Sequence, residues 1–353
     1  MSRRITTQQR PSPRPWRGRT RAKNQGASTQ SAWRKQRSRP RRPRKRPLSG
    51  PALFLGALQI ALTAVLLGHR MIPNRHGIGS LIESFLPWLG LPIVLLGVIS
   101  LASRNYIAVI ASACAVLAWV AMFGTAFLPR SASSAGPDLK VLSHNVYAAN
   151  PDPAATARQL HDAKADVIAV QELTSSVGEE LHAVLDDDYP FQATAGTVTA
   201  WSRYPVRDTT PVDVGLGWVR ALRTTVETPN GDVELYVVHL ASIRFGADGL
   251  ASQRRDATLS ALTEAIADDP ADRLILAGDL NTATTDRSFG GLSAHLTEVQ
   301  RSGGTGFGFT WPSSLPMVRL DHMLSRGLTV TDSTVLDATG SDHRPIMASF
   351  AIR

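Results

Sequence analysis

Eight polar residues in the C-terminal part of the chain could together carry out hydrolysis. They are Asn145, Glu172, His239, Asp279, Asn281, Asp321, Asp342 and His343. Most of them directly follow short apolar runs, which favour β-strands. Strands would deliver such side chains to loops at one end of a sheet, where sites are commonly built on a stable scaffold.

This mixture of side chains suits the attack of water on a phosphate ester. A carboxylate can align the water or accept its proton. Neutral or cationic donors such as Asn and His stabilise the negative charge that develops on the phosphate oxygens. Taken singly, each residue is commonly a turn or capping residue, so the inference depends on the whole ordered set.

The elements that must position these residues alternate between strand-like and helix-like segments. Strands are predicted at Leu139–Val146, Val167–Val170, Val198–Trp201, Arg220–Thr228, Val233–His239, Leu274–Ala277, Leu320–Leu324 and Ile346–Ala351. Helices are predicted at Pro153–Ala163, Ser175–Leu185 and Leu250–Asp268. Asn230-Gly231 between two β-rich runs predicts a hairpin. This mixture predicts an α/β fold in which helices cover the sheets.

The ordered motifs resemble those of the endonuclease/exonuclease/phosphatase superfamily, which has the DNase I-like fold. They are SHNV, AVQE, VVHL, AGDLN, RLDHML and SDHRP, and the resemblance covers residues 138–353. It implies a four-layer αββα sandwich with a phosphoesterase active site. It extends to none of residues 1–130.

The resemblance also implies a metal site. Glu172 resembles the principal metal-binding carboxylate of the family, and Asn145 and Asp342 stand where the family helps to bind the metal or its phosphate. Oxygen ligands of this kind suit Mg²⁺ or Mn²⁺. Cys114 is the only cysteine, which argues against a dedicated zinc site.

Catalytic roles follow from the same resemblance. Asp279 resembles the residue that orients or deprotonates the attacking water, and Asn281 and His239 resemble donors to the phosphate oxygens. His343 would contact the scissile phosphate, with Asp321 orienting its imidazole.

Substrate contacts are expected from less specific features of the sequence. Arg203 and Arg254 are candidates for binding the substrate phosphate. Two loops, 241–250 and 302–318, are candidates for setting specificity, because their aromatic residues could stack on a substrate or contact lipid.

The charge of the chain is unevenly distributed along it. The net charge is +9, but residues 1–50 hold 17 Lys and Arg and no acid, whereas residues 131–353 have a net charge of −11. The Arg/Pro-rich tail, 1–48, is therefore predicted to be disordered and cytoplasmic. The acidic domain offers no obvious basic groove for duplex DNA.

Between tail and domain, residues 51–129 contain three apolar stretches, each near the length that crosses a bilayer. They are 51–68, about 85–102 and 106–128. Three spans and a linker, 130–137, would place the catalytic domain, 138–353, outside the cytoplasm. If the second stretch, with Pro87 and Pro92, were re-entrant, the domain would face the cytoplasm. A cleaved signal peptide fits the first stretch poorly because more apolar stretches follow it.

The sequence therefore predicts a multi-pass, membrane-anchored phosphohydrolase that uses Mg²⁺ or Mn²⁺. Its expected partners are the lipid bilayer and a phosphate ester, which could be a lipid, a small phosphodiester or a nucleic acid. No feature indicates a specific protein partner. Two alternatives are a cytoplasm-facing nuclease with a nucleic-acid-binding tail and a membrane-tethered binding module without catalytic activity.

Overall fold

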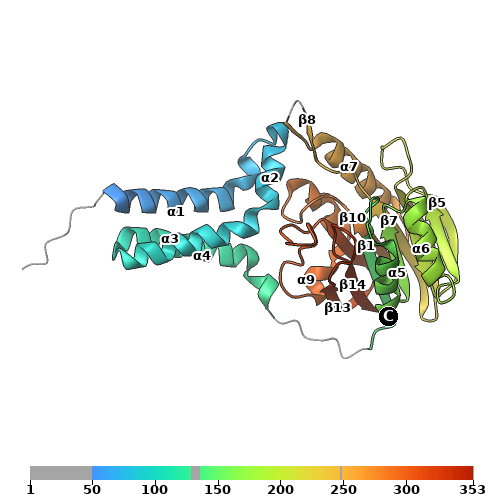
Figure 1. Ribbon diagram of the computed structural model, residues 1–353. Helices are drawn as coiled ribbons and strands as arrows, with labels where there is room; N and C mark the ends of the chain where they lie inside the picture. The colour runs from blue at the N-terminus through green and yellow to red at the C-terminus, as the bar shows by residue number, and fades with distance from the viewer. Residues whose placement is uncertain (1–49, 129–135, 247–248, 353) are drawn as a thin grey trace, which may run out of the picture. The chain divides into compact units, whose positions relative to one another are not determined.

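The computed structural model describes residues 50–128, 136–246 and 249–352. The described residues all belong to one compact unit, residues 48–353. The predicted disordered tail, 1–48, lies outside the described residues, as does most of the predicted linker, 130–137. Figure 1 shows the described elements in chain order.

Two mixed six-stranded sheets form the centre of the C-terminal domain. The first has the order β13-β14-β1-β2-β4-β3, and the second β11-β12-β10-β7-β6-β5. Strands of the first sheet are β1 (Leu139–Asn145), β2 (Val167–Gln171), β3 (Phe191–Ala195), β4 (Val198–Ser202), β13 (Thr329–Val335) and β14 (Ile346–Ala351). Strands of the second are β5 (Val206–Pro211), β6 (Ala221–Thr228), β7 (Gly231–His239), β10 (Leu274–Asp279), β11 (Thr297–Glu298) and β12 (Asp321–Arg326).

Helices cover the outer faces of both sheets, so the predicted four layers are present. They are α5 (Pro153–Asp162), α6 (Ser175–Leu185), α7 (Gln253–Asp268) and α8 (Gly290–His295). The short helix α9 (Val299–Gly303) contacts strands of both sheets and adds Val299 to the core between them. One apolar core lies between the sheets and includes Val141 and Val237. A second lies under α7 and α8, and a third lies under α5 and α6. Alternate strand residues supply the two faces of each sheet.

The predicted hairpin is confirmed: β6 and β7 pair in antiparallel fashion from Thr228↔Gly231 onward. Gly231 has φ +117°, which L side chains rarely adopt, so glycine is required there. The sequence analysis missed β3, β5, β11 and β13, and also the short pair β8 (Arg244–Gly246) and β9 (Gly249–Ala251). The missed strands β5 and β13 lie at sheet edges and carry mostly polar, partly exposed residues, so they lack the apolar pattern that marks a buried strand.

The N-terminal helices are α1 (Gly50–Gly68), α2 (Ile78–Ser84), α3 (Gly90–Ala102) and α4 (Tyr106–Phe123). Among the described residues, two helices are long and apolar enough to cross a membrane. A third crossing is present only if the pair 75–84 and 86–102, bent by 63°, counts as one span. The second predicted stretch is thus not one straight helix from Phe85, because α2 ends and the chain turns before Leu86.

A polar side chain links the three long N-terminal helices. Gln59 on α1 is fully buried, and its Nε2 donates hydrogen bonds to Ile93 O and to Ser112 Oγ, both at 3.0 Å. Burying an amide requires such partners, because an unpaired polar group in an apolar environment destabilises the fold. The contacts fix α1 against α3 and α4, and the three helices run side by side in Figure 1.

Three ends of these helices contact the C-terminal domain. Arg287 Nη2 donates to His69 O just after α1, at 3.3 Å. Trp88 Nε1, just before α3, donates to Met317 O at 2.7 Å. Ala126 O, just after α4, accepts a hydrogen bond from Gly306 N at 2.7 Å. The end of α1, the start of α3 and the end of α4 therefore all lie against the same domain.

Candidate active site

Strand pairing brings polar residues at the ends of five strands together. In the parallel pair β1–β2, Asn145 lies opposite Gln171, so Glu172 follows directly beside it. In the parallel pair β10–β7, Asp279 lies opposite His239, and in the antiparallel pair β10–β12 it also lies opposite Asp321. Two facing sheets thus present their polar strand ends to one region, as the sequence predicts.

Asp321 and His343 form a buried carboxylate–imidazole pair. Asp321 Oδ2 and His343 Nδ1 are 2.8 Å apart, and both residues are buried. Burial opposes the charge of the imidazole, but the carboxylates of Asp321 and Asp279 together raise the pKa of His343 to about 10. The pair therefore holds a protonated imidazole in one orientation.

Asp279 lies at the centre of the site. Its Oδ2 accepts hydrogen bonds from Asn145 Nδ2 at 3.1 Å and from Asn281 Nδ2 at 3.2 Å, and it lies 3.9 Å from His343 Nε2. Burial is the largest cause that raises its pKa, to about 7, and Asp321 adds to the rise while His343 opposes it. A carboxyl group with a pKa in this range can exchange a proton near neutral pH.

Glu172 faces Asp279 across the Asn145 amide. Asn145 Nδ2 donates to Glu172 Oε1 at 3.1 Å while it donates to Asp279. Glu172 has φ +61°, and Tyr147 and Asn281, which flank the same site, have φ +63° and +48°. Such conformations cost on the order of 1–3 kcal/mol for residues other than glycine and are concentrated at functional sites.

The donor set fits a divalent cation. The carboxylates of Asp279 and Asp321 and the imidazole of His343 form a buried group whose ligand atoms all lie within 4.8 Å of one another. Glu172 adds a further carboxylate next to Asp279, and Oδ1 of Asp321 is buried without a hydrogen-bond partner. Converging hard oxygens are the ligands that Mg²⁺ and Mn²⁺ prefer. Because Asp321 already orients His343, the oxygens nearest Glu172 are the better place for the ion.

His239 lies beside Glu172 and Asp279. Its Nε2 lies 3.4 Å from Glu172 Oε1 and 3.7 Å from Asp279 Oδ2, and its ring contacts the Arg220 guanidinium. Burial lowers the pKa of His239 well below its usual value, and Arg220 and His343 lower it further. His239 is therefore neutral and can donate a hydrogen bond without carrying a charge.

A cleft of about 360 Å³ opens onto these groups. It is lined by Glu172, His239, Asp279, Asn281, Asp342 and His343 of the predicted set. Asn145 and Asp321 lie behind this wall, joined to it by the hydrogen bonds described above. Asp342 Oδ2 accepts from Trp311 Nε1 at 3.3 Å. The cleft therefore gathers the predicted residues from both sheets.

The two predicted substrate-binding arginines do not line the cleft. Arg203 lies over the ring of Tyr189 at 5.0 Å, and Arg254 is exposed on α7. Arg220 lines the cleft instead. Its backbone oxygen accepts from His239 N at 2.8 Å, so the pairing of β6 with β7 places it there. Arg220 could have been identified from the register of the predicted hairpin, which pairs it with His239, and not from its residue type alone.

The aromatic residues of loop 302–318 lie in two different places. Trp311 lines the cleft, as predicted for a substrate-contacting residue. Phe307 contacts the rings of Phe123 and Phe127, and Phe309 stacks on Trp88 at 5.7 Å. These two phenylalanines therefore pack against the N-terminal helices instead of facing the cleft. The other predicted loop, 241–250, lies largely outside the residues whose side chains are described.

The N-terminal helices add three residues that the sequence analysis missed. Leu81, Ser84 and Phe85 line the same cleft as the catalytic candidates. Apart from the isolated acid Glu83, nothing in the local sequence of α2 marks these residues as part of a site. Only the contacts between α2 and the C-terminal domain place them there.

The comparisons with known proteins agree with this geometry. The model of the Endonuclease/Exonuclease/phosphatase family matches residues 142–343. A UPF0294 protein of Vibrio campbellii (strain ATCC BAA-1116) is 27% identical over 232 residues, which cover 61% of this chain and 78% of that protein. That name carries no activity.

Solved structures share the fold at low sequence identity. An endonuclease/exonuclease/phosphatase from Bacteroides vulgatus matches with a TM-score of 0.53 and 14% identity, covering 62% of this chain and 100% of that one. Humanized TDP2 of D. rerio matches with a TM-score of 0.52 and 22% identity, covering 60% and 98%. A functionally unknown conserved protein of Enterococcus faecalis V583 gives 0.51 and 17%, covering 61% and 100%.

Proposed function

The chain belongs to the endonuclease/exonuclease/phosphatase family, and we propose that it is a membrane-anchored, divalent-metal-dependent phosphoesterase. One observation carries the proposal: the Asp321–His343 pair, Asp279 and Glu172 converge on one cleft in a chain of this family. The substrate is a phosphodiester or a phosphomonoester, and the nucleophile is water.

The residues divide the work of hydrolysis as follows. Asp279 orients the attacking water and accepts its proton. The water oxygen bonds to phosphorus, the bond to the leaving oxygen breaks, and that oxygen takes a proton and departs as an alcohol. The protonated His343, His239 and Asn281 face the phosphate oxygens, where positive charge and hydrogen-bond donors stabilise the transition state. Asn281 Nδ2 also donates to Leu240 O at 3.1 Å, which fixes its position.

Glu172, Asn145 and Asp342 are the residues proposed to hold Mg²⁺ or Mn²⁺. When bound, the ion neutralises negative charge on the phosphate and stabilises the leaving oxygen. Asn145 bridges Glu172 and Asp279 in the structure, so it keeps two carboxylates at a common position. Glu172 lines the cleft and has a positive φ of +61°.

We place the catalytic domain on the opposite side of the membrane from the N-terminus. The contacts of His69, Trp88 and Ala126 place the end of α1, the start of α3 and the end of α4 against the domain. This arrangement supports three crossings of the membrane by the chain. Seventeen basic residues before the first helix favour a cytoplasmic N-terminus. A protease added to intact cells should then cleave a tag at the C-terminus and spare a tag at the N-terminus. Protection of the C-terminal tag would place the domain in the cytoplasm.

The activity is tested with the full chain in detergent, Mg²⁺ or Mn²⁺, and two soluble substrates, bis(p-nitrophenyl) phosphate and p-nitrophenyl phosphate. We expect metal-dependent release of nitrophenol, lost in Glu172→Gln and retained in Glu264→Gln, whose carboxyl group is exposed on α7. Metal binding without turnover of any phosphate ester would favour a binding module instead.

A further inference from the structure

One wall of the catalytic cleft is built from the N-terminal helices. Leu81 and Ser84 belong to α2, and Phe85 follows its last residue. Leu81 is 43% exposed although it is a large apolar residue. The wall therefore presents an apolar surface within reach of Asp279 and His343, which line the same cleft.

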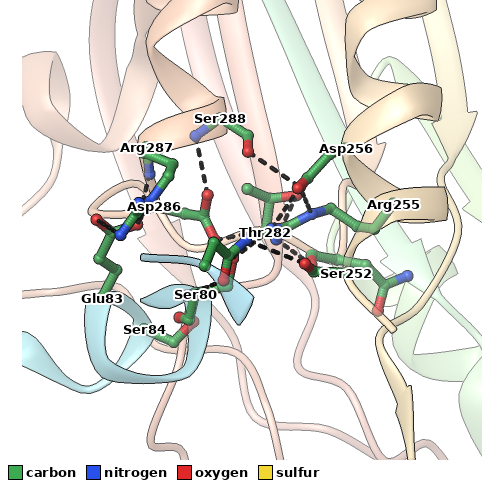
Figure 2. A network of polar contacts seen from close by, with 12 residues as sticks. Ser80, Glu83, Ser84, Ser252, Arg255, Asp256, Thr282, Asp286, Arg287 and Ser288 are labelled. Atoms are coloured by element: carbon green, nitrogen blue, oxygen red, sulfur yellow. Dashed lines mark hydrogen bonds and ion pairs between the residues drawn. The ribbon is translucent and has the colours of Figure 1, made fainter. Parts of the chain in front are cut away.

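An ion pair holds this wall against the C-terminal domain. Glu83 is fully buried, and its carboxylate accepts from the Arg287 backbone N at 2.8 Å and from its Nε at 3.0 Å (Figure 2). Arg287 Nη2 lies 2.9 Å from the other carboxylate oxygen. Paired hydrogen bonds between Arg and a carboxylate fix orientation as well as distance. Glu83 lies between Leu81 and Phe85 in the chain, so it positions both.

A second buried group joins α2 to α7 and to the loop after β10. Arg255 is fully buried, and its Nη2 donates to Ser80 Oγ at 3.0 Å and to Asp286 Oδ2 at 2.8 Å (Figure 2). Ser80 thus extends an ion pair of the domain into the N-terminal helices. We call Ser80, Glu83, Arg255, Asp286 and Arg287 the docking network.

The rest of the cleft rim is also apolar. Among the described side chains after residue 138, the large apolar residues that are exposed are Tyr147, Trp218, Val219, Trp311 and Leu315. All five lie on loops, and Trp311 lines the cleft itself. The other four contact residues of the site or are close to them in the chain. Tyr147 N bonds to Asn145 Oδ1, and Trp218 stacks on Arg220, whose neighbour is Val219. Leu315 is in the turn closed by the Trp311↔Val318 bridge.

Exposed apolar residues gathered at one place commonly mark a binding surface for a membrane or another apolar partner. Trp and Tyr are the residues enriched where a protein meets the boundary between lipid and water. The rim lies beside Trp88, which bonds to Met317 O directly before the apolar helix α3 begins.

We propose that the substrate is a membrane lipid that carries a phosphate ester, and that Leu81 and Phe85 select it by contacting its apolar part while the phosphate enters the polar cleft. The proposal rests on the proposed function and specifies its substrate class. Charge supports it against nucleic acid: the region 131–353 has a net charge of −11. Arg220 is the one Arg or Lys among the described residues that line the cleft, whereas nucleic-acid binding depends on many phosphate contacts.

The test compares three substrates with the full chain and Mg²⁺ or Mn²⁺. The chain is reconstituted in vesicles of phosphatidylcholine and phosphatidylglycerol, and release of the water-soluble headgroup product is measured. Bis(p-nitrophenyl) phosphate and a DNA oligonucleotide serve as substrates without a lipid part. We expect the wild-type chain to hydrolyse vesicle lipid faster than DNA.

Two variants test the wall and the rim, and a third variant is the matched control. Leu81→Ala and Leu315→Ser should each lower the ratio of lipid to soluble-diester turnover by about tenfold, mainly through KM, as expected when an apolar substrate contact is lost. Ile78→Ala removes an equally exposed side chain of α2 that does not line the cleft, and it should leave the ratio unchanged. Since Leu315 is 65% exposed, Leu315→Ser keeps the test valid if Leu81→Ala fails to fold.

The possible outcomes separate this inference from the proposed function. Turnover of the soluble diester or of DNA without turnover of vesicle lipid would overturn the lipid assignment and leave the phosphoesterase standing. An unchanged ratio in both Leu81→Ala and Leu315→Ser would overturn the role of the wall and rim. Failure to hydrolyse any of the three substrates would contradict the phosphoesterase itself.

Discussion

One buried charge cluster belongs to the catalytic cleft and another holds its α2 wall in place, and the two are built differently. In the docking network, the described contacts pair each charged group with an opposite charge: Arg255 with Asp286, and Arg287 with Glu83. In the catalytic cluster, Asp279, Asp321 and His343 place two carboxylates against one imidazole, and Oδ1 of Asp321 has no hydrogen-bond partner.

The difference distinguishes a cluster that stabilises the structure from a cluster that can react. A paired buried cluster is satisfied within the protein, so it fixes one arrangement of α2 on the domain. A cluster with excess negative charge is satisfied only when it gains a proton or a cation, which is the condition of a reactive site. Changing one member of each cluster should therefore have opposite consequences for activity and for stability.

The largest expected effect is on turnover. His343→Gln keeps a donor near Asp321 but removes the positive charge, and it should lower turnover of bis(p-nitrophenyl) phosphate by about 10²–10⁴-fold. The variant also removes the charged partner of the buried Asp321 carboxylate, so its thermal unfolding is recorded to show that the chains assayed are folded. His295→Gln, an exposed histidine at the end of α8, should keep wild-type turnover. Equal losses in both variants would mean that His343 has no special role.

A substitution in the docking network should lower the free energy of unfolding. Asp286→Asn leaves the fully buried Arg255 without its closest buried carboxylate, and breaking such a pair costs about 3–5 kcal/mol. Denaturant unfolding of the full chain in detergent measures this free energy. Asp268→Asn, at an exposed position on α7, is the control. A loss below that of the control would show that Asp286 does not stabilise Arg255.

Metal should stabilise the catalytic cluster and not the docking network. Mg²⁺ at about a hundred times its dissociation constant should add about 2.7 kcal/mol to the free energy of unfolding, measured as a rise in the unfolding midpoint. Glu172→Gln should abolish the rise, and Glu179→Gln, exposed on α6, should retain it. A rise that persists in Glu172→Gln would place the ion elsewhere.

Taken over one pH unit, the smallest effect is that of acid. Burial, and next Arg319, lowers the pKa of His322 from 6.5 to about 3. Above pH 6.5 the histidine is neutral in both folded and unfolded chains; below it, only the unfolded chain gains the proton. His322 should therefore cost about 1.4 kcal/mol of stability per pH unit as the pH falls toward 3. Stability measured in His322→Gln should fall less steeply, whereas an identical slope would contradict the assignment.

Strand ends and their order were predictable from the sequence because buried strands carry continuous apolar runs. Val167–Gln171 and Leu274–Asp279 are buried along their whole length, so the polar residues after or at their ends stand out. By contrast, β13 contains Asp332 and only partly buried or exposed neighbours, and its pairing with β14 depends on tertiary contacts that no local pattern reveals.

Only the site residues that belong to a recognisable sequence motif could be predicted. Asp279 and His343 follow motif positions. Leu81 is an ordinary apolar residue between two predicted apolar stretches, and Phe85 begins the second of them. Their place at the cleft depends on Glu83, the one acid between residues 51 and 130. An isolated acid among apolar stretches was the available signal, since a buried charge requires a partner.

The three contacts at His69, Trp88 and Ala126 have a consequence for how the protein meets other molecules. A domain attached at three points keeps one height and one heading relative to its helices. For a molecule confined to the membrane that we propose these helices cross, reaching the domain is a search across a plane instead of through a volume. The frequency of encounters then depends on the number of molecules per unit area of membrane, and dilution of the surrounding water leaves it unchanged.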